Sequence, residues 1–117
     1  MLPEFNAICD EAKKQIREID SAELRGMLKA GEDFTLIDVR EREEQAKGMI
    51  QGAVAMPRGI VERDIDQVTL DRDRKIVLYC AGGNRSALAA LNLKKMGYRN
   101  VISLIGGWRA WIAGGKP

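Results

Sequence analysis

The stretch Ile76-Val77-Leu78-Tyr79-Cys80-Ala81-Gly82-Gly83-Asn84-Arg85-Ser86 decides the fold of this chain. Its first four residues are apolar and in part β-branched or aromatic, which predicts a short buried parallel strand. Beyond Ser86, leucines and Met96 recur at helical spacing among alanines, and Gly97 is expected to end that helix. Cys80 should therefore lie at the carboxyl end of a strand and at the start of a helix. Open α/β sheets bind their ligands at such strand ends.

The loop from Ala81 to Ser86 has the composition of an anion-binding nest. Gly82 and Gly83 permit the backbone conformations that turn successive amides inward. The start of the helix adds about half a positive charge, and Arg85 adds a full one. A thiol in this field ionises more easily, and the thiolate is the nucleophile. We therefore interpret Cys80 as a reactive cysteine rather than a small buried core residue, in a loop that would hold an anion bonded to its sulfur.

The amino-acid composition excludes several kinds of catalytic and metal-binding site. The 117 residues fit one domain with one core. The chain has no histidine, which excludes a Cys-His or Ser-His catalytic pair and argues against a zinc site. Its two cysteines, Cys9 and Cys80, lie far apart in the sequence and suggest neither a disulfide framework nor a dithiol redox motif. No metal or organic cofactor is expected.

Net charge and hydropathy indicate which partners and which cellular compartment to expect. A net charge of +2 is too small to indicate binding to nucleic acid or to a membrane surface. No apolar run is long enough to span a bilayer, and no secretory signal is visible. A free reactive thiol suits a reducing compartment, so the expected location is the cytoplasm.

Residues 1–15 are expected to form an amphipathic helical extension before a domain at 16–117. Pro3 suits a first helical turn, and Phe5, Ile8, Ala12 and Ile16 fall on one stripe. The stripe would either pack on the domain's own surface, the interpretation we favour, or contact a partner or second copy. Cys9 lies beside the stripe and is interpreted as structural or incidental.

Strands and helices are expected to alternate along the rest of the chain, which predicts an α/β fold with a parallel sheet and helices on both faces. Asp20 or Ser21 should cap a helix that ends at Gly31 and turns Leu24, Met27 and Leu28 inward. The remaining helices are expected at 42–47, 59–63 and 87–96 and in a C-terminal segment that carries Trp108 and Trp111, and the strands at 16–19, 34–39, 52–56, 76–79 and 101–104.

Several segments together resemble the rhodanese (sulfurtransferase) family. Leu78 to Ser86 resembles the family's active-site loop, and the resemblance covers roughly residues 17 to 117. It implies a three-layer fold with a central parallel sheet of about five strands. The other segments that carry it are Leu36 to Glu41, Lys47 to Ala53, Met56 to Gly59 and Leu104 to Trp111. Met49 and Gln51 stand where many members have histidine and proline, a departure that leaves the nucleophile untouched.

The resemblance implies that Cys80 takes sulfane sulfur from a donor such as thiosulfate and passes it to an acceptor such as cyanide, a thiol or a protein. The Cys80 persulfide would be held by the loop, whose members are Ala81, Gly82, Gly83, Asn84, Arg85 and Ser86. The hydroxyl of Ser86 would cap the helix, the interpretation we favour, or hydrogen-bond the sulfur. Asp38 and Arg40 lie two apart at a strand end and so point to the same side. They are candidates for bracing the loop or touching substrate, with a structural ion pair as the alternative. Arg58 is a candidate for steering an anionic donor, with an ordinary surface arginine as the alternative.

Two other functions stay open at this point. A cysteine-dependent phosphatase or arsenate reductase would share the fold, but those enzymes have a longer loop than the four residues between Cys80 and Arg85. A persulfide carrier or a regulatory binding module would act on a protein partner, and a carrier would share every residue named above. The physiological donor and acceptor, the oligomeric state and the role of the N-terminal helix are not determined by the sequence.

Overall fold

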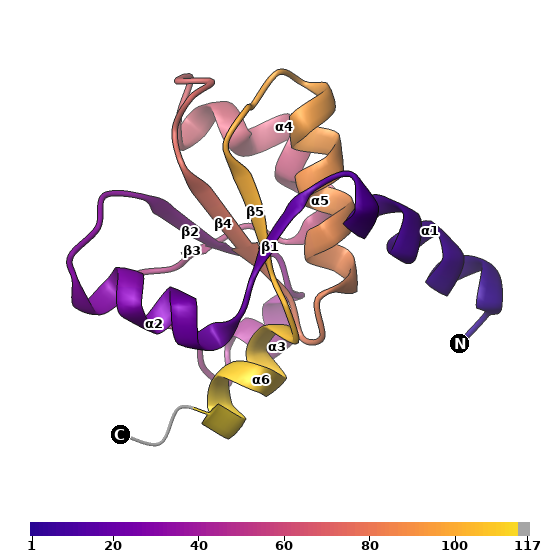
Figure 1. Cartoon of the computed structure of the whole chain (residues 1–117), viewed down its shortest axis with the longest axis horizontal. Coiled ribbons are helices and arrows are strands. Elements are labelled where there is room, and N and C mark those ends of the chain that lie inside the picture. The colour runs from indigo at the N-terminus through magenta and orange to yellow at the C-terminus, as the bar shows by residue number, and fades with distance from the viewer. Residues whose placement is uncertain (115–117) are drawn as a thin grey trace.

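The computed structural model describes residues 1–114 and has five parallel strands in one sheet. The strand order is β1-β5-β4-β2-β3, so β4 lies at the centre (Figure 1). All four strand pairs are parallel, which brings the carboxyl ends of the strands to one edge. The strands are β1 (Arg17–Ile19), β2 (Thr35–Asp38), β3 (Val54–Ala55), β4 (Ile76–Tyr79) and β5 (Val101–Leu104).

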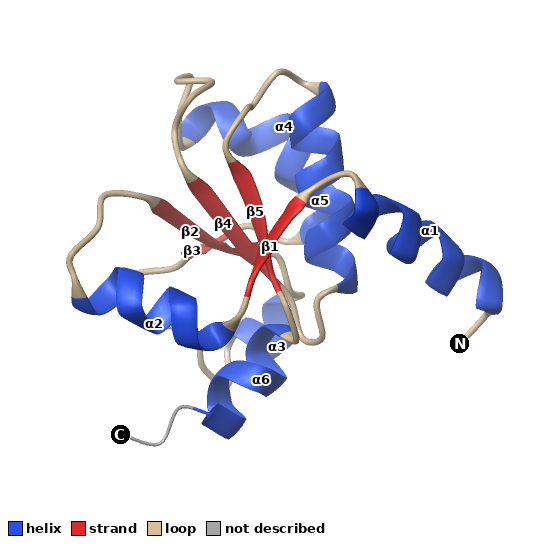
Figure 2. Ribbon diagram, viewed as in Figure 1, coloured by secondary structure: helices blue, strands red, loops and turns tan. Residues whose placement is uncertain are grey.

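Helices cover both faces of this sheet, as Figure 2 shows. Two short 3-10 turns, Arg58–Ile60 and Ile65–Gln67, flank one of the helices. The helices are α1 (Pro3–Lys14), α2 (Ser21–Lys29), α3 (Arg42–Gln45), α4 (Val61–Asp64), α5 (Asn84–Lys95) and α6 (Gly107–Gly114). The predicted α/β class, the three layers and the five-stranded parallel sheet are all confirmed.

Alternating residues of β4 separate the core into two halves. Ile76 and Leu78 pack with α5 and α4 on one face, in a cluster that also contains Cys80. Val77 and Tyr79 pack with α2 and the tryptophans of α6 on the other face. Because side chains alternate along a strand, the central strand is buried on both sides, and all four of its residues are fully buried.

The helix α1 packs along α5, outside the layer that α5 forms. Its contact stripe differs from the predicted one: Cys9 is 1% exposed, whereas Ile8 is 58% exposed. Positions 8 and 9 are both at helical spacing from Phe5 and Ala12, and the way α1 lies on α5 selects Cys9. Leu28 of α2, predicted to face inward, is likewise 36% exposed. Asp20 caps α2 as predicted, accepting a hydrogen bond from the Glu23 amide at 2.8 Å.

The predicted boundary between an extension at 1–15 and a domain at 16–117 stays a prediction. Residues 115–117, which that prediction includes in the domain, lie outside the described residues. Within the described part, α1 ends at Lys14 and β1 begins at Arg17.

Candidate functional site

Cys80 follows β4 directly, at the edge where the parallel strands end. Its side chain is buried, with 1% exposed. Gly83 adopts a φ of +105° and precedes the first residue of α5. This left-handed conformation is open to glycine at little cost, and it lets the chain reverse from strand to helix within a few residues. The predicted strand, tight loop and helix are therefore all present.

The sulfur of Cys80 is surrounded by hydrogen-bond donors. The amide of Gly83 donates to Sγ at 3.0 Å, and the amide of Ser86 donates at 3.4 Å. The hydroxyl of Ser86 lies 3.5 Å from Sγ and 2.8 Å from the hydroxyl of Ser103 in β5. These groups place positive dipoles around the sulfur, as in an anion-binding nest.

These contacts favour the ionised form of the thiol. Burial of the sulfur raises the pKa of Cys80. Hydrogen bonds from the Ser86 hydroxyl and from the amides of Ser86, Gly83 and Gly82 lower the pKa, and together they outweigh the effect of burial. The net result is a pKa below the ordinary value of a cysteine. Cys9, by contrast, has a raised pKa, chiefly because its sulfur is buried. The two cysteines therefore differ in the charge state that their surroundings favour.

The first turn of α6 supports the loop from behind. The amide of Trp108 donates to the carbonyl oxygen of Cys80 at 2.7 Å, and the amide of Arg109 donates to that of Ala81 at 3.1 Å. Gly107 has a φ of +52°, and a Cβ there would lie 2.2 Å from the carbonyl oxygen of Cys80. Sequence reasoning had placed a turn and a helix here but not their contact with the loop. The start of α6 thus satisfies the loop carbonyls, while the loop amides face the sulfur.

A cavity of about 390 Å³ opens onto Cys80. The loop contributes one part of its lining, namely Cys80, Ala81, Gly82, Asn84 and Arg85. The rest comes from distant segments of the chain, with Met1 and Phe5 from the N-terminal segment and Arg109 from α6. Sequence reasoning missed these three residues, because only the packing of α1 and α6 brings them to the loop. The volume of this cavity is within the range of small-molecule binding sites.

The two arginines of this cavity differ in their partners. Arg85 makes two hydrogen bonds to the carboxylate of Glu44 in α3, at 2.8 and 3.1 Å. This contact lowers the pKa of Glu44 to about 2, so the carboxylate is ionised and offsets the charge of Arg85. Within residues 1–114, Arg109 forms no ion pair.

Asp38 and Arg40 form a buried ion pair near the ends of β2 and β4. The Nη2 atom of Arg40 lies 2.8 Å from Oδ2 of Asp38, and its guanidinium lies 4.6 Å from the ring of Trp108. Neither residue is part of the lining of the Cys80 cavity. The pair connects β2, the segment near Gly48 and α6. The predicted role of the pair in bracing the loop stays a prediction.

Arg58 follows β3 and forms its ion pair with Glu62. Its Nη1 atom donates to both carboxylate oxygens of Glu62, at 2.8 and 2.9 Å. It does not line the cavity at Cys80. The structure therefore brings the predicted loop residues together with Cys80 and leaves Asp38, Arg40 and Arg58 outside the cavity.

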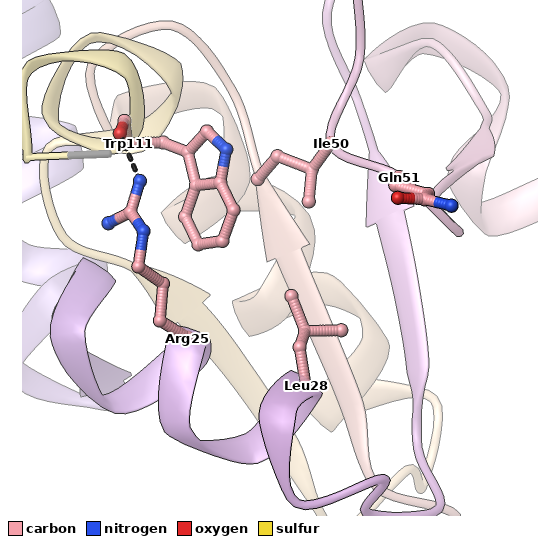
Figure 3. A pocket seen from close by; sticks show the side chains of 5 residues that line it. All are labelled: Arg25, Leu28, Ile50, Gln51 and Trp111. Carbon is pink, nitrogen blue, oxygen red and sulfur yellow. Dashed lines mark hydrogen bonds between the residues drawn. The ribbon is translucent and has the colours of Figure 1, made fainter. Parts of the chain in front are cut away.

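A second cavity of about 360 Å³ lies between α2, α6 and the segment at residues 50–51 (Figure 3). The guanidinium of Arg25 lies 3.8 Å from the ring of Trp111 and also donates to the carbonyl oxygen of Trp111. Leu28 and Ile50 line the cavity, and Gln51 lies at its margin. The residues that line this cavity do not include Cys80 or any member of its loop.

Two further searches cover the part of the chain from Met1 to Gly114. No group of three or more His, Cys, Asp or Glu side chains gathers there as it would around a metal ion. No helix in that part has the length and apolar character needed to cross a bilayer.

Comparison with known proteins gives one consistent family. Residues 20–114 match the model of the rhodanese-like domain. A sulfurtransferase from Allochromatium vinosum is 38% identical over 102 residues, which cover 87% of this chain and 94% of the relative. The YtwF protein of Bacillus subtilis is 39% identical over 103 residues, which cover 88% of this chain and 97% of the relative.

A solved structure resembles nearly the whole chain. It is a protein of unknown function from Rhodopseudomonas palustris, described as a possible tyrosine phosphatase, with a TM-score of 0.83 and 35% identity. The match covers 97% of this chain and 92% of that protein. At the family level, the match to the rhodanese-like domain and the relatives from Allochromatium vinosum and Bacillus subtilis support a sulfurtransferase enzyme.

Proposed function

The chain belongs to the family of rhodanese-like domains, and from this premise we propose that it transfers sulfane sulfur through a persulfide on Cys80. One observation carries the proposal: two backbone amides and a hydroxyl point at the sulfur of a cysteine whose pKa is lowered. Such donors stabilise a thiolate, and they would also stabilise the negative charge of a persulfide.

The reaction proceeds in two displacements. The thiolate of Cys80 attacks the outer sulfur of thiosulfate, and a new S–S bond forms while the S–S bond of thiosulfate breaks. The electron pair leaves on sulfite. The acceptor, cyanide in a test reaction, then attacks the terminal sulfur of the persulfide. A C–S bond forms, the S–S bond at Cys80 breaks, and thiocyanate leaves with the thiolate of Cys80 restored. Electrons balance without an external oxidant or reductant.

The loop residues take distinct parts in this scheme. The amides of Gly82, Gly83 and Ser86 and the hydroxyl of Ser86 hold the charged sulfur. Ala81 contributes the carbonyl that is fixed by α6. Asn84 and Arg85 line the cavity, where they would meet the oxygens of the donor. Asp38 and Arg40 brace the segments below, and Arg58 is proposed to steer the anionic donor from outside the cavity.

The test follows thiocyanate formation from thiosulfate and cyanide. Wild type and Cys9→Ser should be active, whereas Cys80→Ser should be inactive. Mass spectrometry after thiosulfate treatment should show a gain of one sulfur atom on Cys80 only. Failure of the wild type to gain this sulfur from any donor would contradict the proposal.

Two outcomes would point to other functions. A persulfide that forms on Cys80 but resists cyanide and small thiols would indicate a carrier whose acceptor is a protein. Hydrolysis of an aryl phosphate that is lost in Cys80→Ser would indicate a phosphatase. The loop of four residues between Cys80 and Arg85 opposes a phosphatase, because it makes a smaller anion pocket.

A further inference from the structure

The N-terminal segment forms part of the wall of the Cys80 cavity. Met1 and Phe5 both line it, and Phe5 is half-buried. The helix that carries Phe5 is fixed on α5 by two fully covered residues, Cys9 and Ala12, each 1% exposed. At its other end, Lys94 of α5 donates to the carbonyl oxygen of Gln15 at 2.6 Å. An apolar wall is thus held in place beside the reactive sulfur.

The part of the cavity lining that α6 contributes carries a positive charge. Arg85 is offset by the ionised carboxylate of Glu44. Arg109 pairs with no carboxylate in residues 1–114, and its Nη1 atom lies over the loop, 2.9 Å from where a Cβ on Gly82 would be. Its guanidinium can therefore bind an anionic group next to Cys80 with a planar set of donors.

We propose that Phe5 and Arg109 are specificity-determining residues, which select anionic sulfane-sulfur donors that carry an apolar group. The apolar group would lie against Phe5, and Arg109 would bind the anionic part. The cavity of about 390 Å³ is much larger than a small inorganic dianion needs, and one of its walls is apolar. Thiosulfate has no apolar group that could contact that wall. An organic thiosulfonate, R–SO₂–S⁻, has both an apolar group for Phe5 and an anionic group for Arg109.

This inference rests on the proposed function, and its chemistry is the same displacement. The Cys80 thiolate attacks the outer sulfur of R–SO₂–S⁻, a Cys80 S–S bond forms, and the S–S bond of the donor breaks. The electron pair leaves on the sulfinate R–SO₂⁻. In this scheme the group R stays on the leaving product, so its contact with Phe5 affects the choice of donor and not the persulfide that results.

The experiment compares three donors: benzenethiosulfonate, methanethiosulfonate and thiosulfate. The first two share a head group and differ only in their apolar part. In the wild type we expect kcat/KM to be about tenfold higher for benzenethiosulfonate than for methanethiosulfonate. Phe5→Ala should lower this ratio about fivefold or more, and Phe5→Leu should keep part of it. Ile8→Ala is the matched control, because Ile8 is on the same helix, is 58% exposed and does not line the cavity.

Arg109→Gln should lower kcat/KM about tenfold for all three donors and leave the benzene-to-methane ratio unchanged. Arg63→Gln is the control for the change of net charge, because the side chain of Arg63 is 73% exposed and lies outside the cavity. An unchanged ratio in Phe5→Ala, or equal effects of Arg109→Gln and Arg63→Gln, would overturn the inference.

A binding measurement separates this inference from the proposed function. Benzenesulfinate should protect Cys80 from alkylation in the wild type, and protection should weaken about fivefold or more in both Phe5→Ala and Arg109→Gln. If no donor transfers sulfur but this protection pattern holds, the proposed function fails and the assignment of the two binding residues stands. If sulfur is transferred but protection is the same in all variants, the inference fails and the proposed function stands.

Discussion

At the scale of single residues, the chemistry depends on what surrounds the sulfur of Cys80. Burial alone would keep this thiol protonated. The hydroxyl of Ser86 opposes that effect, and Ser103 positions the hydroxyl from β5 at 2.8 Å. Sequence reasoning placed Cys80 and Ser86 in one continuous loop but favoured helix capping for the Ser86 hydroxyl. That prediction was wrong, because the hydroxyl makes no cap on α5 and lies 3.5 Å from the sulfur instead. Ser103 could not be predicted as a site residue, because it lies within a short, mostly apolar strand that is typical of a buried core.

Replacing Ser86 by alanine tests this arrangement. Loss of a donor to the thiolate should raise the pKa of Cys80, so the midpoint of its pH–alkylation profile should move to higher pH. At neutral pH the alkylation rate should fall about tenfold or more, since a hydrogen bond to a charged group contributes about 1.5–3 kcal/mol and each pKa unit corresponds to about 1.4 kcal/mol. The measurement is iodoacetamide modification at varied pH in a Cys9→Ser background, which leaves Cys80 as the one reporting thiol.

A midpoint in Ser86→Ala that equals or lies below that of the background protein would contradict this account. Ser103→Ala should give a smaller shift in the same direction. The hydroxyl of Ser103 acts through Ser86, because it is hydrogen-bonded to the Ser86 hydroxyl at 2.8 Å.

At the scale of elements, α6 holds the loop in the conformation that the sulfur requires. Gly106 and Gly107 predicted a turn before a helix, and the structure has that turn. The local pattern could not show that the amide of Trp108 lies 2.7 Å from the carbonyl oxygen of Cys80, because that contact joins segments far apart in the chain. The same limit explains Phe5 and Arg109, which reach the cavity only through the packing of α1 and α6.

Gly107→Ala should disrupt the contact between α6 and the loop. The added Cβ would lie 2.2 Å from the carbonyl oxygen of Cys80, and the φ of +52° is unfavourable for alanine. We expect a loss of about 2–4 kcal/mol in the free energy of unfolding, together with reduced sulfur transfer. Urea denaturation followed by circular dichroism measures the first effect.

Gly26→Ala is the matched control for this substitution. Gly26 lies within α2, and a Cβ there meets nothing within 4 Å. This change should stabilise the protein by about 0.5–1 kcal/mol, because alanine favours a helix over glycine. Equal changes in the free energy of unfolding for the two substitutions would mean that the close contact between α6 and the loop does not contribute to stability.

At the scale of the whole molecule, the site depends on a sheet whose centre is buried from both sides. The loop extends β4, and its support comes from β5, α6 and the segment after β2. The alternation of Ile76 to Tyr79 between two clusters fixes the direction in which β4 delivers Cys80. This arrangement was predictable, because a run of four apolar residues before a glycine-rich loop is typical of a central parallel strand. The contact stripe of α1 was not, because Ile8 and Cys9 satisfy helical spacing equally well.

Leu78→Ala should therefore weaken the fold far more than the same substitution at the surface. Leu78 is fully buried in the cluster that also contains Cys80, so its truncation removes apolar contacts and leaves a cavity. We expect a loss of about 2–5 kcal/mol in the free energy of unfolding. Leu70→Ala, at a position that is 71% exposed, should change it by about 0.5 kcal/mol or less. Urea denaturation of both variants makes the comparison, and similar midpoints would show that β4 is not the centre of the core.

Sulfur transfer by Leu78→Ala should be lost at a lower temperature than sulfur transfer by Leu70→Ala, because unfolding of the core around β4 also separates Cys80 from its hydrogen-bond donors.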